Sequence, residues 1–432
     1  MEISFGTSST YCSVFFDVNG NYTIQNNEMW IHGSGFNGQI AFPNGIKTIS
    51  VRSSNIFNKR VAIPNGVVSV YNMFGNCKYY NQKTRIPSSV RNARTMFRYA
   101  SNMNSVVQIE NGITDASNIF YYASNFNQNV QIPNSVVNVQ SMFNQCNKFN
   151  QNILIPNSVK YANNMFERCG SFDQNILIPN GVLSINNMFY LCTNLNQAIY
   201  IPDSVSSAGG VFSSCTNLNC NVHLSNNTMY QTGIFKSCNN FNQNIKIPNT
   251  CIATNQMFME CKNFNQNISI PSSVTSSSKM FDGCSSFNQN ISIPPYLVNM
   301  HAMFNNCVSL NQNIQFPAVI NTMQNIFANC TNLNQNIKLS NSSYYIAFQH
   351  SFMNCNNLSD ISFPYNGADN KFYNAFRDNS SVRLNIWTTP DSASDLIITN
   401  LFNTQGAVWT NVENGYYNEF YNVYIYNNLS QQ

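Results

Sequence analysis

The sequence predicts a repeat solenoid, a right-handed coil with a parallel β-sheet on one face and short helical or 3₁₀ returns. Most copies carry a phenylalanine 23 residues after the previous one, a short apolar segment such as I-x-I-P, and a cysteine three residues after the phenylalanine. A fixed period of this length is typical of solenoids, because each coil buries its apolar residues only by stacking on its neighbours. We therefore expect one long domain.

The anchor phenylalanine follows Met, Ile or Val and sets the period. Looser copies begin at Phe57 and continue through Phe352, Phe376 and Phe402, with steps of 17 to 26 residues. The regular anchors, 23 residues apart, are Phe74, Phe97, Phe120, Phe143, Phe166, Phe189, Phe212, Phe235, Phe258, Phe281, Phe304 and Phe327.

Each coil contains the pattern of a short strand. Ile153 and Ile155 alternate with Asn152 and Leu154, and this period of two predicts isoleucines that face the core. Pro156 ends the strand, because proline has no N–H to donate to a continuing ladder.

The return segment carries the other core residues. Phe166 and Cys169 are three residues apart, which places both on one side of a single helical or 3₁₀ turn. Met-Phe pairs such as Met142 and Phe143 are expected in the core. Each coil is therefore predicted to be a strand, a turn and a short helical return.

The flanks differ from the repeats. Asn19-Gly20 lies between apolar runs and predicts a β-hairpin, whereas Trp409 precedes a Tyr-rich segment that alternates like a strand. Solenoid ends expose apolar core unless they are capped. We expect an N-terminal cap with a hairpin at 1–35, the solenoid at 36–407, and a C-terminal cap or docking segment at 408–432.

The composition excludes several classes of partner. Charged residues make up only 9% of the chain, and the net charge of +4 is too small and too scattered for a nucleic-acid interface. The first residues do not resemble a signal peptide, and no run of about 18 apolar residues predicts a membrane span. We expect neither nucleic acid nor a membrane as a partner.

The cysteines repeat with the coils. Ala100 and Ala123 occupy the same position in two coils, so the site accepts a small apolar group without sulfur. Parallel Cβ atoms about 4.8 Å apart suit a disulfide poorly, because bridged Cβ atoms lie about 3.8 Å apart. We expect buried free thiols that fill the core; disulfides and a metal site are the less favoured alternatives. The eleven cysteines at this position are Cys77, Cys146, Cys169, Cys192, Cys215, Cys238, Cys261, Cys284, Cys307, Cys330 and Cys355.

No catalytic, cofactor or metal site is predicted. The glycines of residues 33–38 match a dinucleotide fingerprint, but a strand and Pro43 follow where a helix should begin. His32, His223, His301 and His350 lie in different coils without an acid or nucleophile at motif spacing. A glycan-processing enzyme would need two carboxylates facing one groove, and the acidic residues recur at no common position.

The N-Q-N triplet of each coil is expected to continue the inward and outward alternation of the strand that follows it. Gln151 is expected to point inward, where stacked amides satisfy one another, and Asn150 and Asn152 are expected to point outward. The alternative is functional, because a row of exposed asparagines suits hydrogen bonds to sugar hydroxyls.

The outward position between the two inward strand residues is the most variable of the strand. We predict a recognition surface centred on Tyr200, His223 and Lys246. The alternative is that these exposed positions vary in sequence because no function constrains them. The column reads Gln131, Leu154, Leu177, Tyr200, His223, Lys246, Ser269, Ser292, Gln315 and Lys338.

The run ILIPNSVKYANNMFERC at residues 153–169 resembles the bacterial surface-antigen (BspA-like) class of leucine-rich repeats. The FNQN and MF elements also resemble a repeat of mycoplasmal surface lipoproteins, and the resemblance covers about residues 36 to 402. The resemblance implies a leucine-rich-repeat-like solenoid that binds or adheres; related copies also occur in phage-encoded proteins.

The predicted function is a non-enzymatic binding or structural protein. We favour a phage virion component, such as a fibre or receptor-binding protein, and the alternative is a bacterial surface adhesin with unconventional export. The expected partners are a glycan or protein of the host-cell surface and other virion proteins bound through either flank. Self-association is left open.

Overall fold

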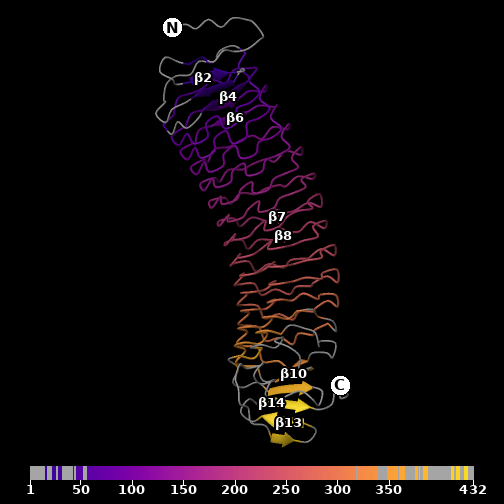
Figure 1. Ribbon diagram of the computed structural model, residues 1–432. Helices are drawn as coiled ribbons and strands as arrows, with labels where there is room; N and C mark the ends of the chain where they lie inside the picture. Colours follow the sequence, from indigo (N-terminus) through magenta and orange to yellow (C-terminus); the bar gives the residue numbers. More distant parts are fainter. Residues whose placement is uncertain are drawn as a thin grey trace. The chain divides into compact units, whose positions relative to one another are not determined.

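Figure 1 shows the computed structural model, in which short coils follow one another along the chain. The chain divides into two compact units, Met1–Leu218 and Asn219–Gln432, and both contain the same repeated coil. The structure describes residues 15–16, 22–25, 28–31, 42, 45–51, 56–317, 320, 322–338, 348–358, 360–364, 375–377, 379, 383–387, 410–412, 415–418 and 423–426.

The first unit begins with a small mixed sheet. β1 pairs with β2 and β2 with β3 in antiparallel fashion, whereas β3 pairs with β4 in parallel. The predicted turn residues, Asn19 and Gly20, lie outside the described residues, and the capping role of this segment stays a prediction. β5 and β6 are also parallel. The strands are β1 (Phe15–Phe16), β2 (Tyr22–Gln25), β3 (Glu28–Ile31), β4 (Thr48–Val51), β5 (Thr84–Ile86), β6 (Val107–Ile109) and β7 (Ile199–Tyr200).

The second unit ends in a six-stranded sheet with the order β12-β13-β14-β11-β10-β9. β9, β10, β11 and β14 are parallel, and the Tyr-rich segment contributes the antiparallel strands β13 and β14. Whether this segment caps or docks the solenoid stays a prediction. The strands are β8 (Val222–His223), β9 (Ile337–Lys338), β10 (Asp360–Pro364), β11 (Arg383–Trp387), β12 (Thr410–Val412), β13 (Gly415–Asn418) and β14 (Val423–Tyr426).

The strand side of the coils follows the predicted alternation. Ile153 and Ile155 are 5% and 3% exposed, whereas Leu154 between them is 75% exposed. On this side β5 pairs with β6 in parallel and Ser292 bridges to Gln315, whereas the longer series of single bridges, such as Asn138 to Tyr161, lies at the start of the returns. The predicted solenoid with parallel strand pairing is confirmed.

Aromatic rings stack through the core of each unit. The ring centroids of Phe143 and Phe166 are 5.7 Å apart, and those of Phe258 and Phe281 in the second unit are also 5.7 Å apart. The phenylalanine of the FNQN element, such as Phe172, packs 4.5 Å from Phe166 in a second aromatic column. Each offset-stacked pair adds roughly 0.5–1.5 kcal/mol to the area that the rings bury.

The returns are successive β-turns, and the prediction of helical or 3₁₀ returns is wrong. None of the described residues lies in a helix. Two residues of the return have positive φ, such as Asn164 (57°) and Arg168 (59°), two before and two after Phe166. A positive φ interrupts a right-handed helix and is required at the third position of a type II turn. Phe166 and Cys169 are both fully buried, so their predicted inward placement is confirmed.

Two sets of backbone hydrogen bonds alternate along each return. The Cys169 N–H donates to the Phe166 carbonyl at 2.9 Å and closes a turn within the coil. The Phe166 N–H donates to the Met188 carbonyl of the next coil, also at 2.9 Å. Nearly every N–H of the return therefore has a backbone partner, which a helix of this length would not provide.

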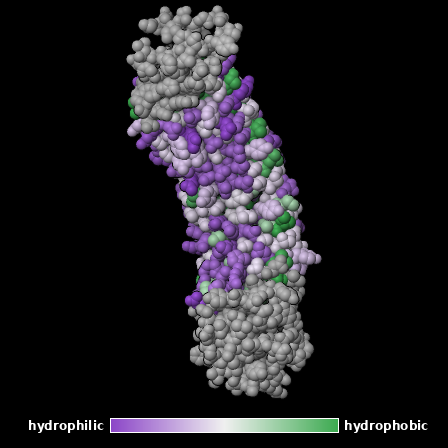
Figure 2. Space-filling view, in the orientation of Figure 1, coloured by the Kyte–Doolittle hydropathy of each residue, from purple (hydrophilic) through white to green (hydrophobic). Residues whose placement is uncertain are grey.

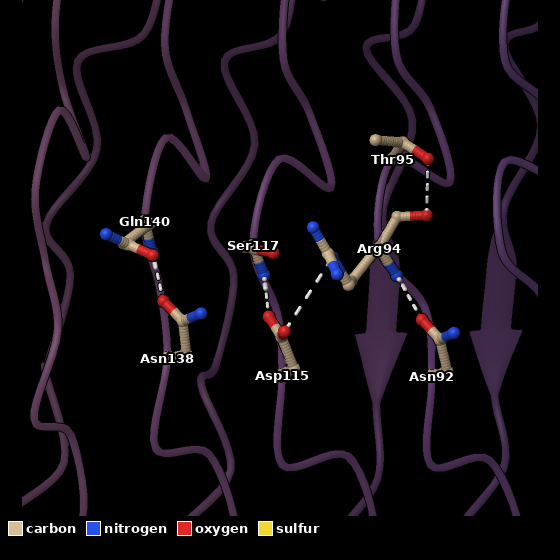
Figure 3. A network of polar contacts seen from close by, with 7 residues as sticks. All are labelled: Asn92, Arg94, Thr95, Asp115, Ser117, Asn138 and Gln140. Carbon is tan, nitrogen blue, oxygen red and sulfur yellow. Dashed lines mark hydrogen bonds and ion pairs between the residues drawn. The ribbon is translucent and has the colours of Figure 1, made fainter.

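Side-chain oxygens fix the start of several returns, as Figure 3 shows for three successive coils. In each coil an Asn or Asp oxygen accepts the N–H of the residue two positions on, an Asx turn. Arg94 and Asp115 of neighbouring coils also form an ion pair at 3.7 Å. The three Asx bonds join Arg94 to Asn92 (3.1 Å), Ser117 to Asp115 (2.9 Å) and Gln140 to Asn138 (3.0 Å).

Candidate binding surface on the strand side

The variable column is exposed wherever the structure describes its side chains. In the first unit Leu154, Leu177 and Tyr200 are 75%, 66% and 52% exposed, and Gln131 is exposed as well. In the second unit the exposed members are His223, Lys246, Ser269, Ser292 and Gln315, and Lys338 ends β9. The predicted outward direction is confirmed for the exposed side chains among them, whereas a role in binding stays a prediction.

The first unit has an open groove of about 850 Å³ on this column. The variable residues Gln131, Leu154 and Leu177 are part of its lining. Tyr200 lies outside this lining, and His223, Lys246, Gln315 and Lys338 belong to the second unit. The structure thus brings together the N-terminal members of the predicted site.

Asparagines line one margin of the groove. Asn129, Asn152 and Asn175 are the last residues of three successive N-Q-N or D-Q-N triplets, and all three are exposed. The outward direction predicted for Asn152 is therefore confirmed. An amide carries both donors and acceptors, so this margin can bond a ligand that is rich in hydroxyls.

Glu110 is a groove residue that sequence reasoning missed. Its carboxylate accepts a hydrogen bond from Arg85 Nε at 2.6 Å and another from the Ser88 N–H at 3.1 Å. Arg85 therefore balances the charge of Glu110, the only acidic residue of the lining. The available signal was that this coil has Glu110 where most other coils have proline after the inward isoleucine.

Side-chain amides next to the groove residues join successive coils in a ladder of hydrogen bonds. Asn127 Oδ1 accepts the Asn150 N–H at 2.9 Å and the Gln151 side-chain amide at 3.0 Å. Asn150 in turn accepts the N–H of Asp173, at 3.0 Å. The first asparagine of the triplet therefore carries the ladder, and the prediction that Asn150 simply points outward is wrong. Gln151 makes the amide bond that was expected of it.

The cysteine column does more than fill space. The thiols of Cys146 and Cys169 donate to the carbonyls of Phe120 and Phe143 in the preceding coil, both at 3.1 Å. Their predicted burial is confirmed, and burial raises the pKa of both thiols. A thiol with a raised pKa is a poor nucleophile and a poor metal ligand. Among the described residues, no cluster of His, Cys, Asp or Glu could hold a metal ion.

A tyrosine cluster lies on the return side of the first unit. The Arg98 guanidinium lies 4.8 Å from the Tyr99 ring centroid and 5.4 Å from that of Tyr121. Tyr122 packs against Tyr99 at 4.8 Å. Because Arg98 already covers two of these rings, the cluster is less suited to a ligand than the groove.

The face of the described coils seen in Figure 2 is largely hydrophilic. Figure 2 shows hydrophobic side chains gathered along one margin of the visible face, beside a broad hydrophilic area. Among the residues that the structure describes, no helix has the length and hydropathy needed to cross a membrane.

A family model described as "Mycoplasma protein of unknown function, DUF285" matches the chain six times. The matches cover residues 35–131, 110–200, 179–270, 212–314, 271–365 and 296–388, well over half of the chain. The chain belongs to the DUF285 family. The predicted resemblance to mycoplasmal repeats is thereby confirmed.

Solved structures resemble this DUF285 protein in fold. A leucine-rich repeat protein from Bacteroides ovatus is 20% identical, with 89% of this chain and 91% of that chain covered and a TM-score of 0.56. A leucine-rich cell surface protein from Faecalibacterium prausnitzii is also 20% identical, with 93% and 100% covered and a TM-score of 0.43. The first comparison shows the fold, and the predicted leucine-rich-repeat-like solenoid is confirmed. No curated protein matches the sequence.

The groove lies within the DUF285 repeats. Its lining, from Ile109 to Leu177, is spanned by the first two family matches. Residues 1–34 and 389–432 lie outside all six matches. The candidate surface is therefore built by the repeated coils rather than by the flanks.

Proposed function

We propose that this DUF285 protein is a non-enzymatic binding protein that holds its ligand in the groove of its first unit, as an adhesin does. The observation that carries the proposal is the pair of large apolar side chains, Leu154 and Leu177, held largely exposed in a groove edged by amides. Apolar groups gathered on a surface and rimmed by polar ones are typical of binding sites.

The charge of the groove supports binding rather than catalysis. Hydrolysis of a glycan needs two carboxylates about 5 to 9.5 Å apart. The lining contains one carboxylate, Glu110, and it is already paired with Arg85. The rival proposal of a glycan-processing enzyme therefore finds no pair of acids in this groove.

Two locations fit a protein of this kind, a bacterial cell surface and a virion. Burial makes thiols such as Cys146 and Cys169 inert, so free cysteines are compatible with both locations. An antibody against the chain, applied to intact cells and to released particles, distinguishes them. Labelling of cells supports the adhesin and labelling of particles the virion component, whereas labelling of neither contradicts display on a surface.

The binding role is tested with a groove variant. Gln131→Ser, Leu154→Ser and Leu177→Ser together should lower attachment to host cells at least about tenfold, while the fold is kept because the side chains are exposed. A matched control changes the same column in the second unit, with Lys246→Ser and Gln315→Ser. Equal attachment by the groove variant and the unchanged protein would overturn the proposal.

A further inference from the structure

The groove repeats one chemical pattern from coil to coil. Its lining comes from four successive coils, at residues 109–111, at 129–134, at 152–154, and at 175 and 177. Stacked strands lie about 4.8 Å apart, so equivalent side chains recur at that spacing along the groove. A ligand that uses every coil must repeat at nearly the same distance.

The spacing favours sugars over amino acids. An extended peptide advances by at most about 3.3–3.6 Å per residue, so its side chains fall out of step with the coils. In an extended β-1,4-linked glycan, successive rings are turned over, and each sugar advances by only slightly more than the spacing of stacked strands, which is about 4.8 Å. Such a chain can place one sugar against each coil without bending.

The side chains suit the two surfaces of a sugar ring. Asn129, Asn152 and Asn175 can donate to and accept from ring hydroxyls along the margin. Leu154 and Leu177 offer apolar surface to the C–H face of the ring. Both groups recur along the groove, as the sugars of a polymer do.

The charge of the groove limits the ligand further. Arg85 and the Ser88 N–H already engage the Glu110 carboxylate, and the lining contains no other charged side chain. A polyanionic glycan would find no cation in this lining to replace its lost hydration. The groove therefore suits an uncharged chain.

We propose that the ligand of this groove is a neutral, linear β-1,4-linked glycan that runs along the stack with one sugar per coil. This inference rests on the proposed binding function and names its substrate class. Four coils line the groove, so a tetrasaccharide fills it.

The test measures affinity against chain length by titration calorimetry of the full chain. The probes are β-1,4-linked glucose and N-acetylglucosamine oligomers, from the disaccharide to the hexasaccharide. Affinity should rise with each sugar up to the tetrasaccharide and change less than about twofold beyond it. Affinity that does not depend on length, or that keeps rising to the hexasaccharide, would contradict one sugar per coil.

A matched pair of variants locates the binding. Asn129→Ala, Asn152→Ala and Asn175→Ala together should lower tetrasaccharide affinity at least about tenfold, because each lost amide hydrogen bond weakens binding several-fold. Asn244→Ala, Asn267→Ala and Asn290→Ala change the same exposed column in the second unit and should leave affinity within about twofold. Equal losses in both variants would overturn the assignment to this groove.

The outcomes separate this inference from the function on which it rests. If the groove variant of Gln131, Leu154 and Leu177 loses cell attachment but no oligomer binds, the glycan is wrong and the binding function stands. If attachment does not depend on the groove, the proposed function fails as well. Stronger binding of a polyanionic glycan of equal length would refute the neutral ligand.

Discussion

The return side and the strand side of each coil hold the stack together in different ways. On the return side, the backbone bonds the next coil directly, and buried Phe and Cys side chains fill the space beneath, as at Phe166 and Cys169. On the strand side, much of the bonding between coils passes through side-chain amides such as Asn150. The column centred on Leu154 takes no part in that ladder. Variation is therefore tolerated on the strand side in this exposed column, where we propose that the ligand binds.

The largest effect is expected from a deletion that places the strand side of one coil against the return side of the next. Removal of one whole coil, residues 149–171, keeps every side in register and should leave a folded, shorter protein. Removal of about half a coil, residues 149–160, places strand-side residues against return-side residues and should expose core and cause aggregation. Size-exclusion chromatography and circular dichroism report both results, and equal tolerance of the two deletions would mean that the sides are interchangeable.

Alkaline pH should lower the stability of the protein through the return side, because the thiols of that side are buried. Burial raises the pKa of Cys77 and of Cys355 to about 12, above the value near 8.5 of an unfolded cysteine. The unfolded chain therefore loses these protons first as the pH rises, so stability is complete below about pH 8.5 and falls toward pH 12. Each such thiol contributes a loss of up to about 1.4 kcal/mol per pH unit.

Urea unfolding from pH 7 to pH 11 measures this loss. Cys169→Ala and Cys192→Ala provide the control, because Ala100 and Ala123 show that the position accepts alanine. The double variant should lose less stability with pH than the unchanged chain. An identical slope would mean that the thiols do not titrate on unfolding. Thiol labelling should be slow in the folded protein and complete after denaturation, and a reductant should leave the melting temperature unchanged.

Asn150 and Asn152 belong to one triplet but have different roles: Asn150 bonds the next coil, and Asn152 is exposed. Asn150 accepts the Asp173 N–H and the Gln174 amide, so Asn150→Ala leaves two donors without their partner and should cost about 1–3 kcal/mol. Asn152 is exposed, and Asn152→Ala should change stability by no more than about 0.5 kcal/mol. Urea midpoints compare the two. A loss for Asn152→Ala as large as that for Asn150→Ala would mean that the ladder includes the groove margin.

The repeat could be predicted from the sequence because its buried residues are chemically alike. Phe166, Cys169 and Ile153 recur at one spacing, and a period of 23 residues has few structural solutions. The turns of the return could not be predicted in the same way. Arg168 and Leu191 adopt positive φ, which is unusual for such residues. The residue types at these positions therefore do not predict the turn. The hydrogen bonds to the next coil impose this conformation.

The candidate site could be predicted only in part, for a related reason. Outward direction follows from the period of two, so Gln131 and Leu177 were placed correctly. The centre was chosen by chemical type, which favoured Tyr200, whereas a groove depends on how neighbouring coils are shaped. The exchange of proline for Glu110 and the adjacency of Leu154 and Leu177 contribute to that shape. Residue type alone does not encode it.

The smallest effect on stability is expected where the sequence placed the centre of recognition. Tyr200, His223 and Lys246 are exposed, so replacing all three with serine should shift the urea midpoint little, by about 0.5 kcal/mol per site or less. Attachment decides between the two centres. If the groove is the site, this variant keeps its attachment to host cells, whereas the Gln131, Leu154 and Leu177 variant loses at least about tenfold. A tenfold loss in the Tyr200 variant alone would move recognition to the centre that the sequence indicated. In that case, the apolar pair in the groove would need another partner, because two leucines that are 75% and 66% exposed are unusual on a surface that is otherwise rich in amides.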